Sequence, residues 1–79
     1  MQKRKARLYF KDEELLKQVG IKIRDARTAL NLSIEALANE CEVDYSQINR
    51  MELGKVNYSI SYLSKVAKGL KLNPKDLLP

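Results

Sequence analysis

Apolar residues recur at intervals of three and four along most of this 79-residue chain, and that spacing predicts helices. The first helical segment starts at Asp12, has two acidic residues in its first turn and ends at Asn31. Its apolar positions are Leu15, Leu16, Val19, Ile23, Ala26 and Leu30. Gly20 weakens a helix by about 1 kcal/mol relative to alanine. The main helix is therefore expected to begin near Val19, with residues 12–18 as an extension.

Residues 33–54 predict two short helices joined by a tight turn. Ser33 can cap the first helix and Asp44 the second, with Gln47 as the other half of a capping box. Gly54 supplies a C-terminal stop. The apolar positions are Ile34, Leu37, Ala38 and Cys41 in the first helix, and Ile48 and Met51 in the second. The opposite face of the second helix carries hydrogen-bonding side chains: Tyr45, Ser46, Gln47, Asn49 and Arg50.

The remaining residues predict a loop followed by two further helices. Ser59 can cap the first of these, whose inward positions are expected to be Ile60, Leu63, Val66, Ala67 and Leu70. Asn73 and Asp76 are spaced as a capping box for a short last helix, with Pro74 at its first position. This order of elements predicts an all-α fold, a compact bundle of five short helices.

The positive charge of the chain is concentrated at its N-terminus. The net charge is +5, and residues 1–11 hold no acidic residue but five basic ones: Lys3, Arg4, Lys5, Arg7 and Lys11. The rest of the chain has ten basic and ten acidic residues, and residues 33–54 carry a net charge of −4. We therefore expect a basic arm over residues 1–11 and a helical domain over residues 12–79. The arm is either a solvated terminus or a segment that contacts phosphates or the minor groove of DNA.

The composition argues against enzymes and metalloproteins. The chain has no histidine and one cysteine, which excludes Ser-His-Asp and Cys-His catalytic groups and metal sites built on those residues. Three glycines do not form a phosphate-binding loop, and no apolar run is long enough to span a membrane. A single cysteine fits a reducing, cytoplasmic location, where Cys41 packs as a small apolar group. We expect no enzyme activity, no cofactor, no small-molecule ligand and no membrane partner.

The stretch SIEALANECEVDYSQINRMELGK, followed by LSKVAKGLKLNPKDLL, resembles the helix-turn-helix of the Xre/Cro family of phage-repressor-like DNA-binding domains. The shared pattern is a Ser or Thr cap, Leu-Ala, a second cap, an Ile, Glu-x-Gly-Lys and a later Leu-x-x-x-Ala-x-x-Leu. The resemblance covers most of the chain, from Val19 to Leu78. It implies a lambda-repressor-like domain with the helix-turn-helix at its second and third helices, and it implies double-stranded DNA as the partner of a homodimer.

The resemblance also implies roles for individual residues. Base contacts would come from Tyr45, Ser46 and Arg50, and Gln47 would contact a base or a phosphate. Asn49 is a further reader, because Asn and Gln can bond adenine while Arg can bond guanine. The expected phosphate contacts are Lys22, Lys55, Asn57, Tyr58, Ser59 and the arm residues Lys3, Arg4, Lys5 and Arg7. Arg27 is expected to pair with Glu52 and so to tie the first helix to the third, a structural role ranked above a DNA contact for Arg27.

This chain departs from the family pattern at three positions. Ile34 stands where many members carry a polar residue that binds phosphate, and Tyr58 replaces a frequent proline. Glu42 stands where glycine often occupies the turn, so it must adopt a positive φ at a cost of about 1–2 kcal/mol, or the turn must differ. The leading hypothesis is a sequence-specific transcriptional regulator that binds operator DNA. The alternative is a helix-turn-helix domain that serves as a protein-interaction adaptor.

Overall fold

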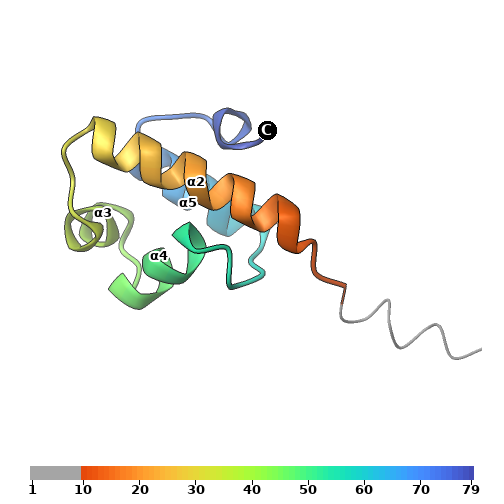
Figure 1. The fold of residues 1–79 in the computed structure, drawn as a ribbon. Coiled ribbons are helices and arrows are strands. Elements are labelled where there is room, and N and C mark those ends of the chain that lie inside the picture. The colour runs from red at the N-terminus through yellow and green to blue at the C-terminus, as the bar shows by residue number, and fades with distance from the viewer. Residues whose placement is uncertain (1–9) are drawn as a thin grey trace, which may run out of the picture.

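The computed structural model describes residues 10–79, which form four α-helices and one short 3-10 helix (Figure 1). These elements are α2 (Glu13–Ala29), α3 (Ile34–Cys41), α4 (Tyr45–Glu52), α5 (Ile60–Gly69) and η1 (Pro74–Leu77). The prediction of an all-α bundle is confirmed. Five short helices were predicted, and the fifth of these is a short 3-10 helix and not an α-helix.

The helices begin where capping side chains are available. The Leu15 backbone N–H donates to Asp12 Oδ1 at 3.1 Å, and the Ser33 and Ser59 hydroxyls accept in the same way at the starts of α3 and α5. The predicted capping box of Asp44 and Gln47 is wrong, since Asp44 makes no side-chain cap hydrogen bond. Instead the Gln47 backbone N–H donates to the Asp44 carbonyl oxygen at 3.1 Å, and the Gln47 side chain bonds Arg50.

Helix α2 runs without a break through Gly20, so the expectation that the main helix begins near Val19 is wrong. Gly20 is buried at the point where α2 meets α4. A Cβ atom at this position would lie 2.4 Å from the Glu52 carbonyl oxygen and 2.6 Å from that of Met51. The absence of a side chain at Gly20 therefore allows the backbones of the two helices to come into contact.

We expect Gly20→Ala to lower the free energy of unfolding by up to about 2 kcal/mol. The added methyl group overlaps backbone atoms that cannot move aside, an effect of about 1–3 kcal/mol that the better helix propensity of alanine offsets by about 1 kcal/mol. Gly69→Ala is the matched control, because its Cβ meets the Cys41 side chain, which can rotate. Denaturant unfolding should show the smaller loss for Gly69→Ala, and a Gly20→Ala variant more stable than the wild type would contradict the argument.

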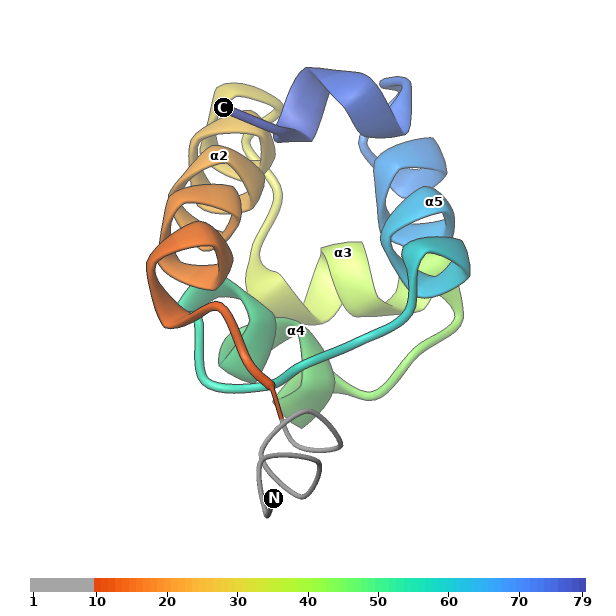
Figure 2. The same cartoon turned by 90° about the vertical axis from the view of Figure 1, so that its right-hand side faces the viewer.

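The core lies between α2 on one side and α5 on the other, with α3 and α4 beneath and η1 above (Figure 2). Its fully buried side chains come from every element: Ile23, Leu37, Ile48, Met51, Val66 and Leu77. Ile60 was expected to point inward, and this is wrong: 68% of its surface is exposed, because the first turn of α5 stands at the edge of the core. Leu15 and Leu30 of the predicted apolar stripe are also exposed.

Residues other than glycine end three of the helices in the left-handed conformation. Glu42 has φ 60° at the end of α3, so it adopts the left-handed conformation in which glycine is usually found. Asn31 after α2 and Lys71 after α5 have similar values of 58° and 63°. The turn after α3 therefore orients α4 with a strained backbone at Glu42.

Candidate nucleic-acid interface

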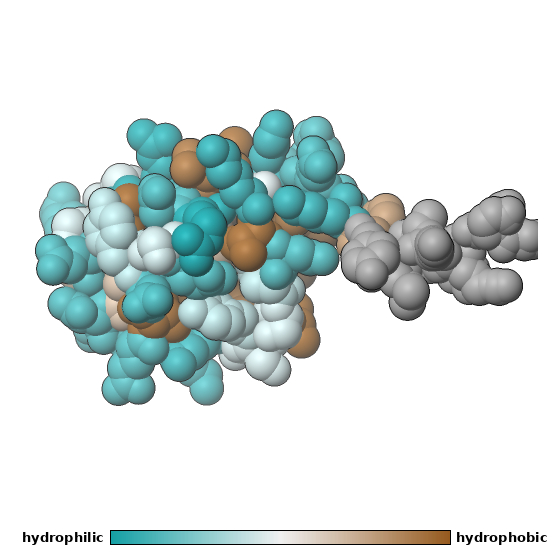
Figure 3. Space-filling model, turned by 90° about the horizontal axis from the view of Figure 1, so that it is seen from below, coloured by the Kyte–Doolittle hydropathy of each residue, from teal (hydrophilic) through white to brown (hydrophobic). Residues whose placement is uncertain are grey.

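Helix α4 presents a polar face to solvent on the side opposite its buried residues. Ile48 and Met51 are buried, and successive residues of a helix are rotated by about 100°. Ser46, Asn49 and Arg50 therefore point away from the core, with Ser46 and Arg50 exposed and Asn49 half-buried. Figure 3 shows that the molecule is largely hydrophilic when it is seen from this side. The polar side chains thus lie on a surface that a large ligand can approach.

The Arg50 guanidinium is held beside Gln47. Arg50 Nη2 donates to Gln47 Oε1 at 3.2 Å, one turn back along α4. Gln47 is half-buried and Tyr45, at the start of the helix, is exposed. The five predicted base-reading residues therefore lie on one short helix, and the hydrogen bond restrains two of them relative to each other.

Tyr62 of α5 is a neighbour of this face that was not predicted. Burial raises the pKa of its hydroxyl, Asp44 and Cys41 raise it further, and Arg50 lowers it. Nothing in the local pattern around Tyr62 indicated this position.

The structure brings Arg27 of α2 and Glu52 of α4 together in a two-point contact. Arg27 Nε lies 2.6 Å from Glu52 Oε2, and Nη2 lies 3.1 Å from Oε1. Arg27 Nη1 also donates to the Leu32 carbonyl oxygen at 2.8 Å. The side chains are only 12% and 5% exposed, and the hydrogen bond to Glu52 keeps the pKa of Arg27 above its ordinary value. The pair therefore fixes the C-terminal end of α4 against α2.

Four of the five predicted phosphate-binding residues that lie within residues 10–79 are exposed. Lys55, Asn57 and Ser59 lie in the loop after α4, and Lys22 lies on α2. The Tyr58 hydroxyl differs from these four, because it is buried and has no hydrogen-bond partner among residues 10–79, and its phosphate contact stays a prediction. The arm residues Lys3, Arg4, Lys5 and Arg7 lie outside the described residues.

Two further lysines lie at the C-terminal end of α4. Lys11 Nζ donates to the Lys55 carbonyl oxygen at 3.2 Å. Gly54 packs so closely on α2 that a Cβ there would lie 2.7 Å from the Lys17 Cα. Lys11, Lys17 and Lys55, here called the lysine cluster, thus come together from two segments of the chain. The sequence marked these residues only as basic, since their proximity depends on the packing of α2 against α4.

Comparison with known proteins identifies the family of this chain. A family model described as helix-turn-helix matches residues 23–77. The chain belongs to this helix-turn-helix family, of the Xre/Cro type. Control protein C.BamHI from Bacillus amyloliquefaciens is 40% identical over 60 residues, which cover 75% of this chain and 74% of that protein. The crystal structure of the restriction-modification controller protein C.AhdI from Aeromonas hydrophila is similar with a TM-score of 0.77 and 35% identity, covering 80% of this chain and 96% of that one.

A further relative is an uncharacterized transcriptional regulator in the ATPase CF(0) region of Rhodospirillum rubrum, 42% identical over 52 residues, which are 48% of its length. The DNA-binding domain of BldD has a TM-score of 0.78 at 24% identity, which shows the shared fold alone. Within the family fold, α3 and α4 are the two helices of the helix-turn-helix. None of the helices in residues 10–79 has the length and apolar character needed to cross a membrane.

Proposed function

We propose that this chain is a transcriptional regulator that binds a specific operator in double-stranded DNA as a homodimer. The family supports a role as a DNA-binding regulator, because its helix-turn-helix members include such regulators. Binding to a specific operator is supported by the exposed polar face of α4, where Ser46, Asn49 and Arg50 point away from the core.

In this proposal α4 enters the major groove by its N-terminal end while α3 lies across the backbone. Arg50 bonds the edge of a guanine, and Asn49 or Gln47 bonds an adenine. Ser46 and Tyr45 contact bases from the first turn of the helix. The Gln47–Arg50 hydrogen bond supports this arrangement, because a guanidinium that is already oriented loses less freedom on binding.

The lysine cluster would contact the phosphates beside the groove. The helix-turn-helix unit is acidic, but Glu52 is neutralised by Arg27 inside the protein. Lys55 lies in the loop that follows α4, Lys11 donates to the Lys55 carbonyl oxygen, and Lys17 packs against Gly54. Their charges, together with those of the arm, would supply the electrostatic attraction that the unit itself lacks.

We expect the double variant Lys17→Ala, Lys55→Ala to flatten the slope of log K against log salt by up to about 0.9 for each phosphate that is no longer neutralised. Deleting residues 1–7 removes four positive charges and should act in the same direction if the arm binds phosphates. Sequence preference should persist in both variants, because phosphate contacts do not read bases. Lys75→Ala on η1, at the opposite end of the molecule, is the control, and slopes equal to wild type would mean that the deleted charges lie off the DNA.

The names of two relatives narrow the proposed role. C.BamHI is called a control protein, and C.AhdI a restriction-modification controller protein. This chain aligns with 74% and 96% of their lengths. We therefore propose that its operator controls genes of a restriction–modification system.

The acidic surface of α3 favours one alternative, a protein-interaction adaptor. Glu35 and Glu40 on α3, with Glu42 and Asp44 in the turn, are all exposed. In-vitro selection from a random DNA pool at low salt separates the two functions. We expect enrichment of a two-fold symmetric sequence, and its occurrence beside restriction or methyltransferase genes supports the narrower role. No enriched sequence would eliminate the regulator.

A further inference from the structure

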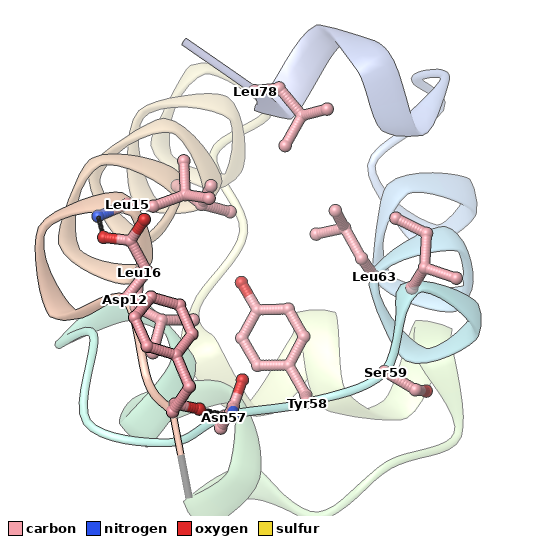
Figure 4. A pocket seen from close by; sticks show the side chains of 11 residues that line it. Asp12, Leu15, Leu16, Asn57, Tyr58, Ser59, Leu63 and Leu78 are labelled. Carbon is pink, nitrogen blue, oxygen red and sulfur yellow. Dashed lines mark hydrogen bonds between the residues drawn. The ribbon is translucent and has the colours of Figure 1, made fainter. Parts of the chain in front are cut away.

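The residues that lead into α2 are bonded to the loop that follows α4. Asn57 Nδ2 donates a hydrogen bond to the Phe10 carbonyl oxygen at 3.4 Å, at the point where the chain enters α2 (Figure 4). Next to it, Lys11 Nζ donates to the Lys55 carbonyl oxygen at 3.2 Å. Residues 10–12, here called the entry segment, are therefore joined to residues that lie 44 and 47 positions further along the chain.

Little apolar burial holds the entry segment in place. Phe10 is 72% exposed, and the other two residues of the segment are exposed as well. Asn57 has a firmer support, because its chain neighbours Val56 and Tyr58 pack against the core. The Asn57 amide therefore joins an exposed segment to a part of the loop that is anchored on the core.

The entry segment brings the Lys11 ammonium group into the lysine cluster. Within residues 10–79 the Arg27–Glu52 pair is the one salt bridge, so no carboxylate is paired with the lysines of the cluster. Like charges that gather without a counterion repel each other, and a phosphate placed among them would relieve this repulsion. Without its attachments, an exposed lysine in a segment near the chain terminus would move away from the other two.

We propose that Asn57 is a positioning residue, which holds the entry segment on the loop and so keeps the Lys11 ammonium group where a DNA phosphate binds. This inference rests on the proposed function, in which the lysine cluster contacts phosphates. It gives Asn57 a different role from the direct phosphate contact expected from the sequence, because the Asn57 amide is already bonded inside the molecule. A segment that is held in place before binding loses less conformational freedom when DNA is bound.

Asn57→Ala is expected to flatten the slope of log K against log salt by up to about 0.9, although it removes no charge. The substitution frees the entry segment, so Lys11 no longer neutralises its phosphate. Lys11→Met should flatten the slope by the same amount, because it removes the ammonium group itself. A direct hydrogen bond from Asn57 to a phosphate would act differently. Its loss would weaken binding but leave the slope of the wild type, since a neutral amide releases no counterion.

Gln18→Ala is the matched control for the loss of an amide group. Gln18 is exposed on α2, and its Nε2 donates to Glu14 Oε2 at 3.1 Å, so its hydrogen bond stays within one helix. Affinity and salt slope should both stay near those of the wild type. The proposal would be overturned if Lys11→Met flattened the slope while Asn57→Ala did not, or if neither variant changed it.

The order of the entry segment can also be measured in the full chain without DNA. The heteronuclear NOE values of the Phe10 and Lys11 amides should be well above those of a flexible terminus in the wild type. Asn57→Ala should lower these values and leave those across α2 and α5 unchanged, because the hydrogen bond to Phe10 is lost while the core stays intact. Equal values in the wild type and in Asn57→Ala would refute the positioning role, since a residue that only contacts phosphate has no effect in the free protein.

Selection from a random DNA pool separates this inference from the proposed function. The wild type and Asn57→Ala should enrich the same sequence, because Lys11 contacts a phosphate and reads no base. A wild-type chain that enriches no sequence would refute the proposed function, and Asn57 would then have no role in operator binding. Enrichment by the wild type together with an unchanged salt slope in Asn57→Ala would refute the positioning role alone.

Discussion

Replacing Glu52 with alanine is expected to lower the free energy of unfolding by about 3–5 kcal/mol. The change removes both hydrogen bonds that the Arg27 guanidinium donates to the carboxylate, and it leaves the guanidinium in a site that is only 12% exposed. A small domain has roughly 5–15 kcal/mol of total stability, so the melting temperature should fall substantially. Thermal and denaturant unfolding followed by circular dichroism measure the loss. An unchanged melting curve would mean that the pair contributes nothing in solution.

Two further variants separate the ion pair from other effects. Glu40→Ala removes a carboxylate from the exposed side of α3 and should change stability by about 0.5 kcal/mol or less. The double variant Arg27→Met, Glu52→Leu should recover much of the loss, because apolar pairs often replace buried ion pairs without cost. Below the melting temperature, Glu52→Ala should select the same DNA sequence as wild type, since Glu52 faces α2 and not the exposed side of α4.

The parts of the fold that could be predicted are those governed by local pattern. The spacing of Leu37, Ile48 and Val66 with their neighbours sets helices whose apolar faces must meet, and serine caps set where α3 and α5 begin. The role of Gly20 could not be predicted, because its reason is a contact with the Glu52 carbonyl, 32 residues away. Ile60 continues the apolar spacing of α5, yet it extends past the core and is exposed.

The candidate site also has parts that the sequence could predict and parts that it could not. The polar face of α4 follows from helical geometry once Ile48 and Met51 are known to be buried. The lysine cluster cannot be predicted from helical geometry, because Lys17 lies near the end of α4 only through the close packing at Gly54. Tyr58 was predicted from its polar group and its loop, while the structure turns its hydroxyl inward. Contacts between distant segments thus decide which of the candidate side chains are exposed.

Arg50→Ala is expected to weaken binding to the best operator by about 1–3 kcal/mol and to relax selection at one base pair in each half-site. Arg50 is exposed on α4, and its guanidinium is positioned by Gln47 at 3.2 Å. Its planar fork matches the two acceptors of guanine, which lysine cannot match. A homodimer should show the relaxed position twice, related by two-fold symmetry. Random-pool selection with the variant measures both effects.

Three control variants identify what Arg50 contributes. Arg50→Lys keeps the charge but not the fork, so it should lose preference at the same base pair if Arg50 reads guanine. Gln47→Ala leaves Arg50 free to rotate and should weaken this preference by less than Arg50→Ala. Arg24→Ala removes an exposed arginine from α2 and should leave the selected sequence unchanged. If Arg50→Ala weakened all sequences equally and Arg50→Lys restored them, Arg50 would be a phosphate contact, since a phosphate requires charge and not base geometry.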